Sequence, residues 1–337
     1  MVSPVETIHL AAARSGDQQH FSELIEPYQC ELRAYCYRLL GSLQDAEDAV
    51  QETMLRAWRR LDTFEGRASF RAWLYKIATN VSLDALDKAK RRGLPSTLYP
   101  PADPQTSHIV PINDPIWLDP FPDDWLDESA MELETHYALR ESVTLAFLTA
   151  LQVLPPRQRA VLVLCDVLDW RASEVAQFLA ITTSAANSAL HRARSTLSKH
   201  YLIGQTKPAT ISSSTRTLLE RYVRAWETTD VAGLVSLLKE DATYTMPPTS
   251  TWFQGREAVR RFFASSIFVQ GLSYRLQPIH VSSQPGFAAY LHNPQSDQFE
   301  AHAIHVLNLN NDQLVALTTF LNPALFSHFG LPNLLNP

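Results

Sequence analysis

The sequence has little cysteine and no long apolar run. Only three of its 337 residues are cysteines, Cys30, Cys36 and Cys165, and their spacing matches neither a disulfide framework nor a metal motif. We therefore expect three small buried side chains, a reducing compartment, and neither a metal nor a cofactor. No stretch approaches the roughly 18 apolar residues of a membrane span, and no secretory signal pattern is present. These features predict a cytoplasmic protein without a membrane partner.

The chain also lacks the excess of positive charge that is typical of nucleic-acid-binding proteins, because its formal net charge is −6. The charges are segregated, however. Residues 53–92 carry 10 basic and 4 acidic side chains, residues 93–140 carry 1 and 9, and residues 141–200 carry 6 and 4. Since binding to a polyanion depends on the local potential, the two basic segments leave a nucleic-acid function open.

The length suits two or three domains. Composition and periodicity divide the chain into a helical domain over 1–92, an acidic proline-rich linker over 93–140, a second helical domain over 141–203 and a C-terminal domain over 204–337. The linker contains the aromatic residues Trp117, Phe121 and Trp125 among acidic ones. A solvated linker has little use for such side chains, so we expect them to dock on a neighbouring domain.

Apolar residues recur at helical spacing in both basic segments. The pattern predicts helices over 45–61, with Asp45 and Asp48 as capping residues, and over 69–90. Further along, a helix over 173–179, a short turn and a second helix capped by Ser184 form a helix-turn-helix pattern. An ordinary helical hairpin is the alternative interpretation of that last pattern.

The C-terminal domain begins with helices over 215–239 and 257–264 and continues with alternating segments that predict antiparallel strands, so its class is α+β. The stretch "TMPPTSTWFQGREAV" suggests the rim of a pocket, with plain core packing as the alternative. The candidate pocket residues are Tyr244, Met246, Trp252, Phe253 and His302. His302 and His305 differ by an odd step, so we expect them on opposite faces of one strand. A structural histidine is favoured over a catalytic one, and we expect no enzyme.

Residues 53–92 combine what the opening of a DNA duplex requires: cations for phosphates and flat side chains for exposed bases. The segment "FEGRASFRAWLYKIATNVSLDALDKAKRR" interleaves both kinds of residue. Phe70, Leu74 and Ile77 are expected to be core residues in either case. For the basic residues, a merely solvated helix face remains the alternative.

Three segments resemble, in order, the conserved parts of bacterial RNA polymerase sigma factors of the extracytoplasmic-function group. They are "DAEDAVQETMLRAW", "FRAWLYKIATN" followed by "KRR", and "LPPRQRAVLVLCDVLDWRASEVAQFLAITTSAANSALHRARSTL". The resemblance implies two all-α domains, of which the second contains a helix-turn-helix. It also implies two partners, the RNA polymerase core, bound through the clamp of its largest subunit and its flap region, and promoter DNA.

The resemblance assigns roles residue by residue. Core-polymerase binding falls to Asp45, Glu47, Asp48, Gln51 and Glu52; the −10 element to Arg67, Arg71, Lys76, Asn80, Arg91 and Arg92; and the −35 element to Ser184, Asn187, Ser188, His191, Arg192 and Arg194. Members of the group often carry Lys or Arg where this chain has Asn187 and Ala189. Fewer phosphate contacts should lower non-specific affinity and its salt dependence.

Residues 211–330 resemble the SnoaL-like, nuclear-transport-factor-like α+β cone, and a subgroup of these sigma factors carries such a domain. The resemblance implies that this domain and the linker regulate promoter-specific initiation through intramolecular contacts, and that the domain could hold a small-molecule ligand. A related subgroup ends in an Asn-Pro-Asp motif, whereas this chain has "NPALF". Two other functions remain as alternatives: a SnoaL-type isomerase or hydrolase with a helical targeting region, and a helix-turn-helix repressor.

Overall fold

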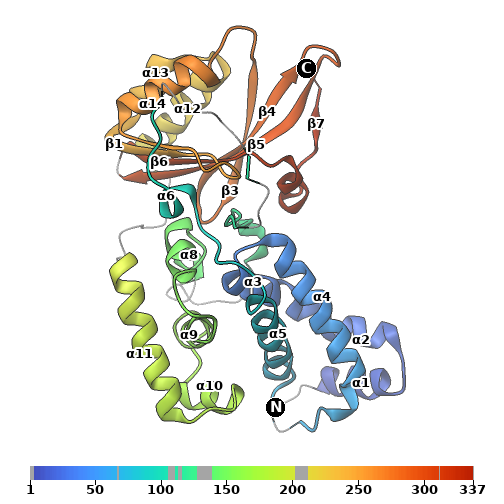
Figure 1. Cartoon of the computed structure of the whole chain (residues 1–337). Coiled ribbons are helices and arrows are strands. Elements are labelled where there is room, and N and C mark those ends of the chain that lie inside the picture. Colours follow the sequence, from blue (N-terminus) through green and yellow to red (C-terminus); the bar gives the residue numbers. More distant parts are fainter. Residues whose placement is uncertain are drawn as a thin grey trace. The chain divides into compact units, whose positions relative to one another are not determined.

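The computed structural model describes residues 4–66, 68–104, 111–112, 116–126, 139–201, 212–310 and 312–336. The chain forms two compact units (Figure 1). Unit 1 comprises residues 1–91, 125–142 and 146–203, and unit 2 comprises residues 92–124, 143–145 and 204–337. The expected fold class is confirmed, because helical domains precede a C-terminal α+β domain with a sheet. No helix in the described ranges is both long and apolar enough to cross a membrane.

The N-terminal half of unit 1 is helical. Its elements are α1 (Pro4–Arg14), α2 (Gln18–Ile25), η1 (Glu26–Tyr28), α3 (Gln29–Leu40), α4 (Leu43–Arg59), η2 (Leu61–Thr63) and α5 (Phe70–Leu86). Gly41 ends α3 in the left-handed conformation at φ 71°, which glycine adopts without strain. Ser42 then caps α4 by accepting a hydrogen bond from the Asp45 amide. The expected capping by Asp45 and Asp48 is therefore wrong, because the helix begins earlier.

The C-terminal half of unit 1 contains α8 (Leu145–Leu151), α9 (Pro156–Leu162), η4 (Val163–Val167), α10 (Ala172–Phe178) and α11 (Thr183–His200). Helices α10 and α11 form the expected helix-turn-helix. The cap of α11 is Thr182, whose hydroxyl accepts from the Ala185 amide at 3.1 Å. Ser184 lies inside the first turn and does not cap the helix.

Two buried arginines connect the halves of unit 1. Arg159 of α9 donates to the carbonyl of Leu39 in α3 and to Gln152 Oε1 at 2.7 Å. Arg38 of α3 donates through Nε to Ser142 Oγ at 2.9 Å. Burial lowers the pKa of both guanidinium groups to about 10. Removing either side chain would leave buried polar partners unsatisfied, so the two arginines fix how the halves pack.

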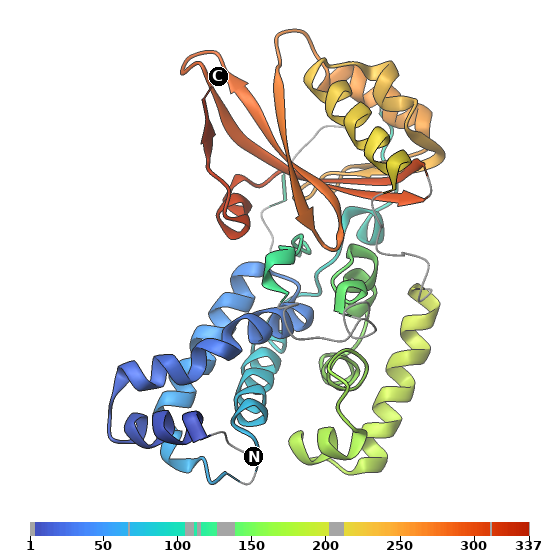
Figure 2. The same ribbon diagram turned by 180° about the vertical axis from the view of Figure 1, so that it is seen from behind.

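Unit 2 is built on a sheet that has seven strands in its described residues, in the order β2-β1-β6-β5-β4-β3, with β7 pairing β5 (Figures 1 and 2). The strands are β1 (Leu238–Thr245), β2 (Trp252–Gln254), β3 (Tyr274–Val281), β4 (Gln284–Asn293), β5 (Gln298–Asn310), β6 (Gln313–Phe320) and β7 (Leu334–Leu335). Only the pairing of β1 with β6 is parallel among these described strands.

Helices cover one face of this sheet and complete the cone. They are α12 (Ser213–Glu227), α13 (Val231–Val235) and α14 (Arg256–Phe262), followed by η5 (Phe263–Ile267). Trp226 of α12 is at the centre of the core, with its ring in edge-to-face contact with Phe263, Phe268 and Tyr274. Unit 2 also contains α6 (Pro95–Leu98), most of η3 (Asp123–Trp125) and η6 (Pro323–Phe329).

The described part of the linker up to residue 124 belongs to unit 2 and is hydrogen-bonded to the cone. The Trp252 indole donates to the Tyr99 carbonyl at 2.9 Å, and the Ile112 amide donates to the Pro248 carbonyl at 2.8 Å. At the turn between β3 and β4, the Phe121 amide donates to Ser282 Oγ at 3.0 Å, and the Ser282 amide donates back to the Phe121 carbonyl at 2.8 Å. The expectation that linker aromatics dock is confirmed here for Phe121.

Trp125 also docks, in its case in unit 1, where the Arg33 guanidinium lies 5.1 Å from its ring centroid.

All three cysteines are free, but only Cys36 is fully buried, whereas Cys30 and Cys165 are half-buried. The expectation of three buried cysteines is therefore correct for one of them.

Candidate nucleic-acid interface and the C-terminal core

The residues expected to bind core polymerase share one helix, α4. Asp48 and Gln51 are exposed, and Asp45, Glu47 and Glu52 are half-buried. Glu52 accepts a hydrogen bond from Arg56 Nε at 2.6 Å, and Arg56 also pairs with Asp84 at 3.3 Å. The helix thus presents carboxylates on a surface that opposes the apolar stripe formed by Ala46, Val50, Thr53 and Ala57.

Leu55 lies on the same exposed face and was missed in the sequence. Its side chain is 51% exposed, and it follows Asp48, Gln51 and Glu52 at positions i+7, i+4 and i+3 of the helix. An exposed leucine beside two carboxylates and an amide is a combination that a protein contact can use as an apolar centre with a polar rim. Its position outside the buried stripe of α4 is the signal that could have identified it.

Some of the residues expected to bind the −10 element are exposed, and others form hydrogen bonds or ion pairs within the protein. Lys76 and Asn80 of α5 are exposed one helical turn apart, and Arg91 is exposed beyond the helix. Arg71 forms a two-pronged ion pair with Glu31 at 2.7 and 2.9 Å, and its guanidinium lies 4.9 Å from the Tyr75 ring centroid. Arg92, in unit 2, donates to the Trp117 carbonyl at 3.2 Å. Arg67 lies outside the described residues.

The core of α5 is as expected, because Phe70, Leu74 and Ile77 are 2%, 0% and 7% exposed. Aromatic rings extend from this core to the surface beside Lys76. Phe64 contacts Trp73 with ring centroids 5.4 Å apart, and Trp73 is half-buried. A cationic, amide-bearing and aromatic surface can bind phosphates and stack unpaired bases.

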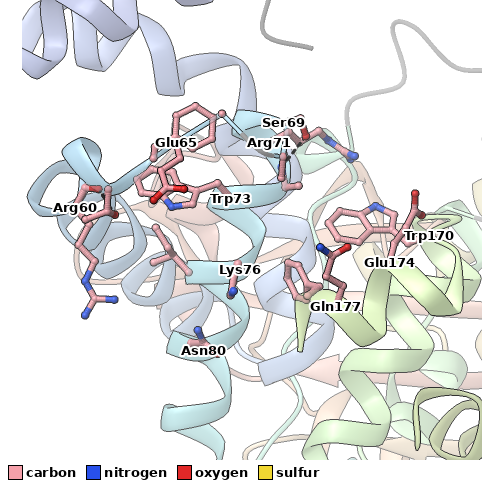
Figure 3. Close-up of a pocket in the computed structure, with 17 residues that line it drawn as sticks. Arg60, Glu65, Ser69, Arg71, Trp73, Lys76, Asn80, Trp170, Glu174 and Gln177 are labelled. Atoms are coloured by element: carbon pink, nitrogen blue, oxygen red, sulfur yellow. Dashed lines mark hydrogen bonds between the residues drawn. The ribbon is translucent and has the colours of Figure 1, made fainter. Parts of the chain in front are cut away.

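A pocket of about 810 Å³ opens over this surface within unit 1 (Figure 3). Lys76, Asn80 and Trp73 line one side, and Trp170, Gln177 and Phe178 line the other. Trp170 contacts Tyr75 at 5.6 Å and Phe178 at 5.2 Å between ring centroids. The second helical half of unit 1 therefore covers part of the surface of the first half. No local pattern predicts that these residues meet, because they are about a hundred positions apart.

The expected −35 residues lie on α11. Ser184, Asn187, Ser188, His191, Arg192 and Arg194 are all exposed. At 100° per residue they fall on one side of the helix, whereas Ala186, Leu190, Ala193 and Leu197 pack inward. Arg194 is held by Asp166 at 2.6 and 3.0 Å, and this hydrogen bonding raises the pKa of the guanidinium. The exposed side of α11 has the dimensions and polarity to enter a major groove.

The candidate pocket residues of the C-terminal domain are mostly core residues. Tyr244, Met246 and Phe253 are at most 1% exposed and belong to the apolar core of the cone. Trp252 bonds to the linker carbonyl of Tyr99, and His302 is half-buried with its ring 6.2 Å from the Tyr274 centroid. A pocket formed by these five residues stays a prediction.

The expectation that His302 and His305 face opposite sides of their strand is wrong. In the pairing of β4 with β5, Ala289 opposes Ala303 while Tyr290 opposes Ala301, so His302 is an extra residue in a bulge. A bulge shifts the alternation of side chains by one. Consequently both imidazoles lie near the aromatic rings around Trp226. The ring centroid of Trp226 lies 4.4 Å from that of His305 and 5.2 Å from that of Tyr274.

His305 is a buried, neutral base. It is fully buried, and Tyr222 Oη lies 2.9 Å from its Nδ1. Burial, with a smaller contribution from His302, lowers the pKa of His305 to about 3. Burial also lowers the pKa of His302. The ring is therefore uncharged at neutral pH and packs as part of the core.

Comparison with known proteins identifies the domains. Residues 24–92 match the Sigma-70 region 2 family, residues 144–197 match Sigma-70 region 4, and residues 219–317 match the SnoaL-like domain family. The ECF RNA polymerase sigma factor SigG of Mycobacterium tuberculosis is 41% identical over 329 residues, which cover 96% of this chain and 86% of SigG. The chain belongs to the ECF group of RNA polymerase sigma factors.

Two further similarities support the three-part architecture of this sigma factor. SigJ of Mycobacterium tuberculosis is 28% identical over 317 residues, covering 90% of this chain and 92% of SigJ. The crystal structure of SigJ covers 92% of this chain and 99% of that chain with a TM-score of 0.55 and 21% identity. Sigma factors bind core polymerase and promoter DNA and are not enzymes. The expected class of partners is thereby confirmed.

Proposed function

We propose that this sigma factor directs promoter-specific initiation through two surfaces of unit 1. The exposed Lys76 and Asn80 beside Trp73 bind the −10 element, and the exposed side of α11 binds the −35 element. The observation that carries the proposal is that a cation, an amide and an aromatic ring lie on successive turns of α5 and line one side of the same pocket. Arg67 and Arg91 add phosphate contacts, and the protein acts in the cytoplasm, where polymerase and DNA are.

The acidic side of α4 is the contact for the clamp of core polymerase. Asp48 and Gln51 are exposed there and Leu55 adds an apolar centre. Interfaces of this kind gain affinity from a buried apolar centre and specificity from a polar rim. The second helical half of unit 1 binds the flap region of core polymerase.

Unit 1 must open before it binds a promoter. Trp170 and Phe178 stand opposite Lys76 and Asn80 across the pocket, so a melted DNA strand would compete with them for the same surface. The two buried arginines hold this closed packing, and polymerase binding supplies the free energy that shifts the population to the open form.

The cone regulates this opening and does not catalyse a reaction. His305, its best candidate for acid–base chemistry, is fully buried and has Tyr222 Oη against its Nδ1, whereas a general base must reach its substrate. The cone instead holds the linker through Phe121 and Tyr99. A small-molecule ligand of the cone would act by strengthening or weakening the docking of the linker on the cone.

A promoter-opening experiment tests the −10 assignment. Full-length protein with core polymerase is mixed with a promoter fragment that carries a fluorescent base analogue in the −10 element. The K76A/N80A double variant should open the fragment at least about tenfold less, which corresponds to about 1.4 kcal/mol of lost contact. The control is K239A, which removes a lysine from the cone. Equal opening by the wild type and the double variant would refute the assignment.

A further inference from the structure

We propose that the hairpin of α1 and α2 holds a divalent transition-metal cation between His9, His20 and Glu23. The three side chains come from two helices, and their ligand atoms all lie within 4.8 Å of one another. No other group of three such residues comes together in the described part of the chain. The binding of the metal itself does not rest on the proposed promoter contacts.

The ligand atoms of the three side chains lie slightly farther apart than in a metal-bound site, so they would have to move a short distance toward one another. His9 Nδ1 already lies 3.2 Å from Glu23 Oε2. Bonds of about 2.0–2.1 Å around a tetrahedral zinc place neighbouring ligand atoms about 3.4 Å apart. The remaining separations therefore need to close by about one ångström or slightly more, which side-chain rotation can supply.

The hydrogen bonding of the two imidazoles is incomplete without a metal. His9 Nδ1 and His20 Nδ1 are both buried atoms that make no hydrogen bond of acceptable geometry, although each lies close to a carboxylate oxygen, at 3.2 and 2.8 Å. Two simple ion pairs would leave these nitrogens poorly satisfied. A cation between them would accept both nitrogen lone pairs and the carboxylate together.

The neighbouring residues fix the ligands in place. His20 and Glu23 are three residues apart on α2 and share one face. Gln19 Nε2 donates to Glu23 Oε1 at 3.1 Å, which leaves Oε2 on the side of His9. Asp17 caps α2 with Oδ1, and its Oδ2 lies 2.8 Å from His20 Nδ1, which holds that imidazole beside the start of the helix.

The donor set selects the class of metal. Two imidazole nitrogens with one carboxylate suit Zn²⁺, Co²⁺ or Ni²⁺, whereas Ca²⁺ and Mg²⁺ prefer oxygen ligands alone. The sequence did not predict this site because His9 and His20 are eleven residues apart, and only the turn between α1 and α2 brings them together.

The site would connect metal binding to the −10 surface. The Arg14 guanidinium of α1 donates to the carbonyl of Phe64, and Thr7 and Leu10 of α1 line a second pocket together with Phe64 and Glu65. Phe64 also borders the pocket over Lys76. A metal that ties α1 to α2 would therefore order α1 against the loop that supports Trp73.

Calorimetric titration of the full-length, metal-free protein with Zn²⁺ tests the proposal. We expect one equivalent to bind and the unfolding midpoint to rise. The H9Q/H20Q double variant should lose about 100-fold or more of the affinity, while the control H200Q, at the exposed end of α11, should bind like the wild type. Equal metal-free midpoints of the double variant and the wild type would show that the loss is not caused by unfolding.

Titration with Co²⁺ separates this site from the cysteines. The visible spectrum should be that of nitrogen and oxygen ligands, and it should persist in a C30S/C165S variant. Absence of saturable binding, unchanged affinity in H9Q/H20Q, or a thiolate spectrum that C30S/C165S abolishes would each overturn the proposal.

Discussion

The docking of the linker on the cone predicts a large effect of Phe121→Ala. Phe121 is 0% exposed and exchanges two hydrogen bonds with Ser282, which is itself fully buried. Truncating a buried phenylalanine costs about 3–5 kcal/mol. A surface segment can partly collapse into the space, so we take about 3 kcal/mol. At about 1.4 kcal/mol per factor of ten, local opening at the β3–β4 turn should become about 100-fold more frequent.

Amide hydrogen exchange of the full-length protein measures this opening directly. The Ser282 amide donates to the Phe121 carbonyl, so its protection reports whether the linker is docked. Asp123→Ala removes the carboxylate that accepts from the Ser283 amide at 2.8 Å, and the loss of one such bond, about 1 kcal/mol, should speed exchange about fivefold. Asp124→Ala is the control, because Asp124 is exposed. Unchanged protection of Ser282 in Phe121→Ala would refute the reasoning.

Three other predictions concern single side chains. In a pull-down titration Leu55→Asp should weaken binding to core polymerase at least about tenfold without changing the unfolding midpoint. Leu334→Asp, at an equally exposed leucine, should leave that binding unchanged. Equal loss of binding in both variants would contradict a specific contact. The pKa of His305 is about 3 in the folded state and about 6.5 in the unfolded state. Between about pH 7 and pH 5 only the unfolded state takes up the proton, so the free energy of unfolding of the cone should fall by about 2 kcal/mol. In urea titrations His305→Asn should lack this fall, and an equal fall in the variant would refute the prediction. Asn187→Lys should steepen the salt dependence of DNA binding by about 0.9 in the logarithmic slope, and an unchanged slope would place that residue away from phosphate.

The parts of the fold that follow from local pattern could be predicted. The apolar stripe of α4 and the inward alanines of α11 have helical spacing, and the alternation in 274–320 indicates the strands. Boundaries were less accurate where two cap residues compete. Thr182 rather than Ser184 caps α11 because the first turn begins two residues earlier than a cap at Ser184 requires.

The features that depend on distant residues could not be predicted. Arg71 belongs to a basic segment, but the fold places Glu31, forty residues earlier, against it. A one-residue bulge brings His302 and His305 to the same ring cluster, and no periodicity reveals a bulge. Trp170 meets Tyr75 because the two halves of unit 1 pack together, and two buried arginines form hydrogen bonds across that packing.

Run-off transcription with core polymerase and genomic promoter fragments tests the central claim most directly. We expect discrete start sites with the full-length protein, a changed amount of transcript with Phe121→Ala, and loss of transcripts with the K76A/N80A double variant. Only background transcription by the wild type, or equal transcripts from wild type and double variant, would contradict it.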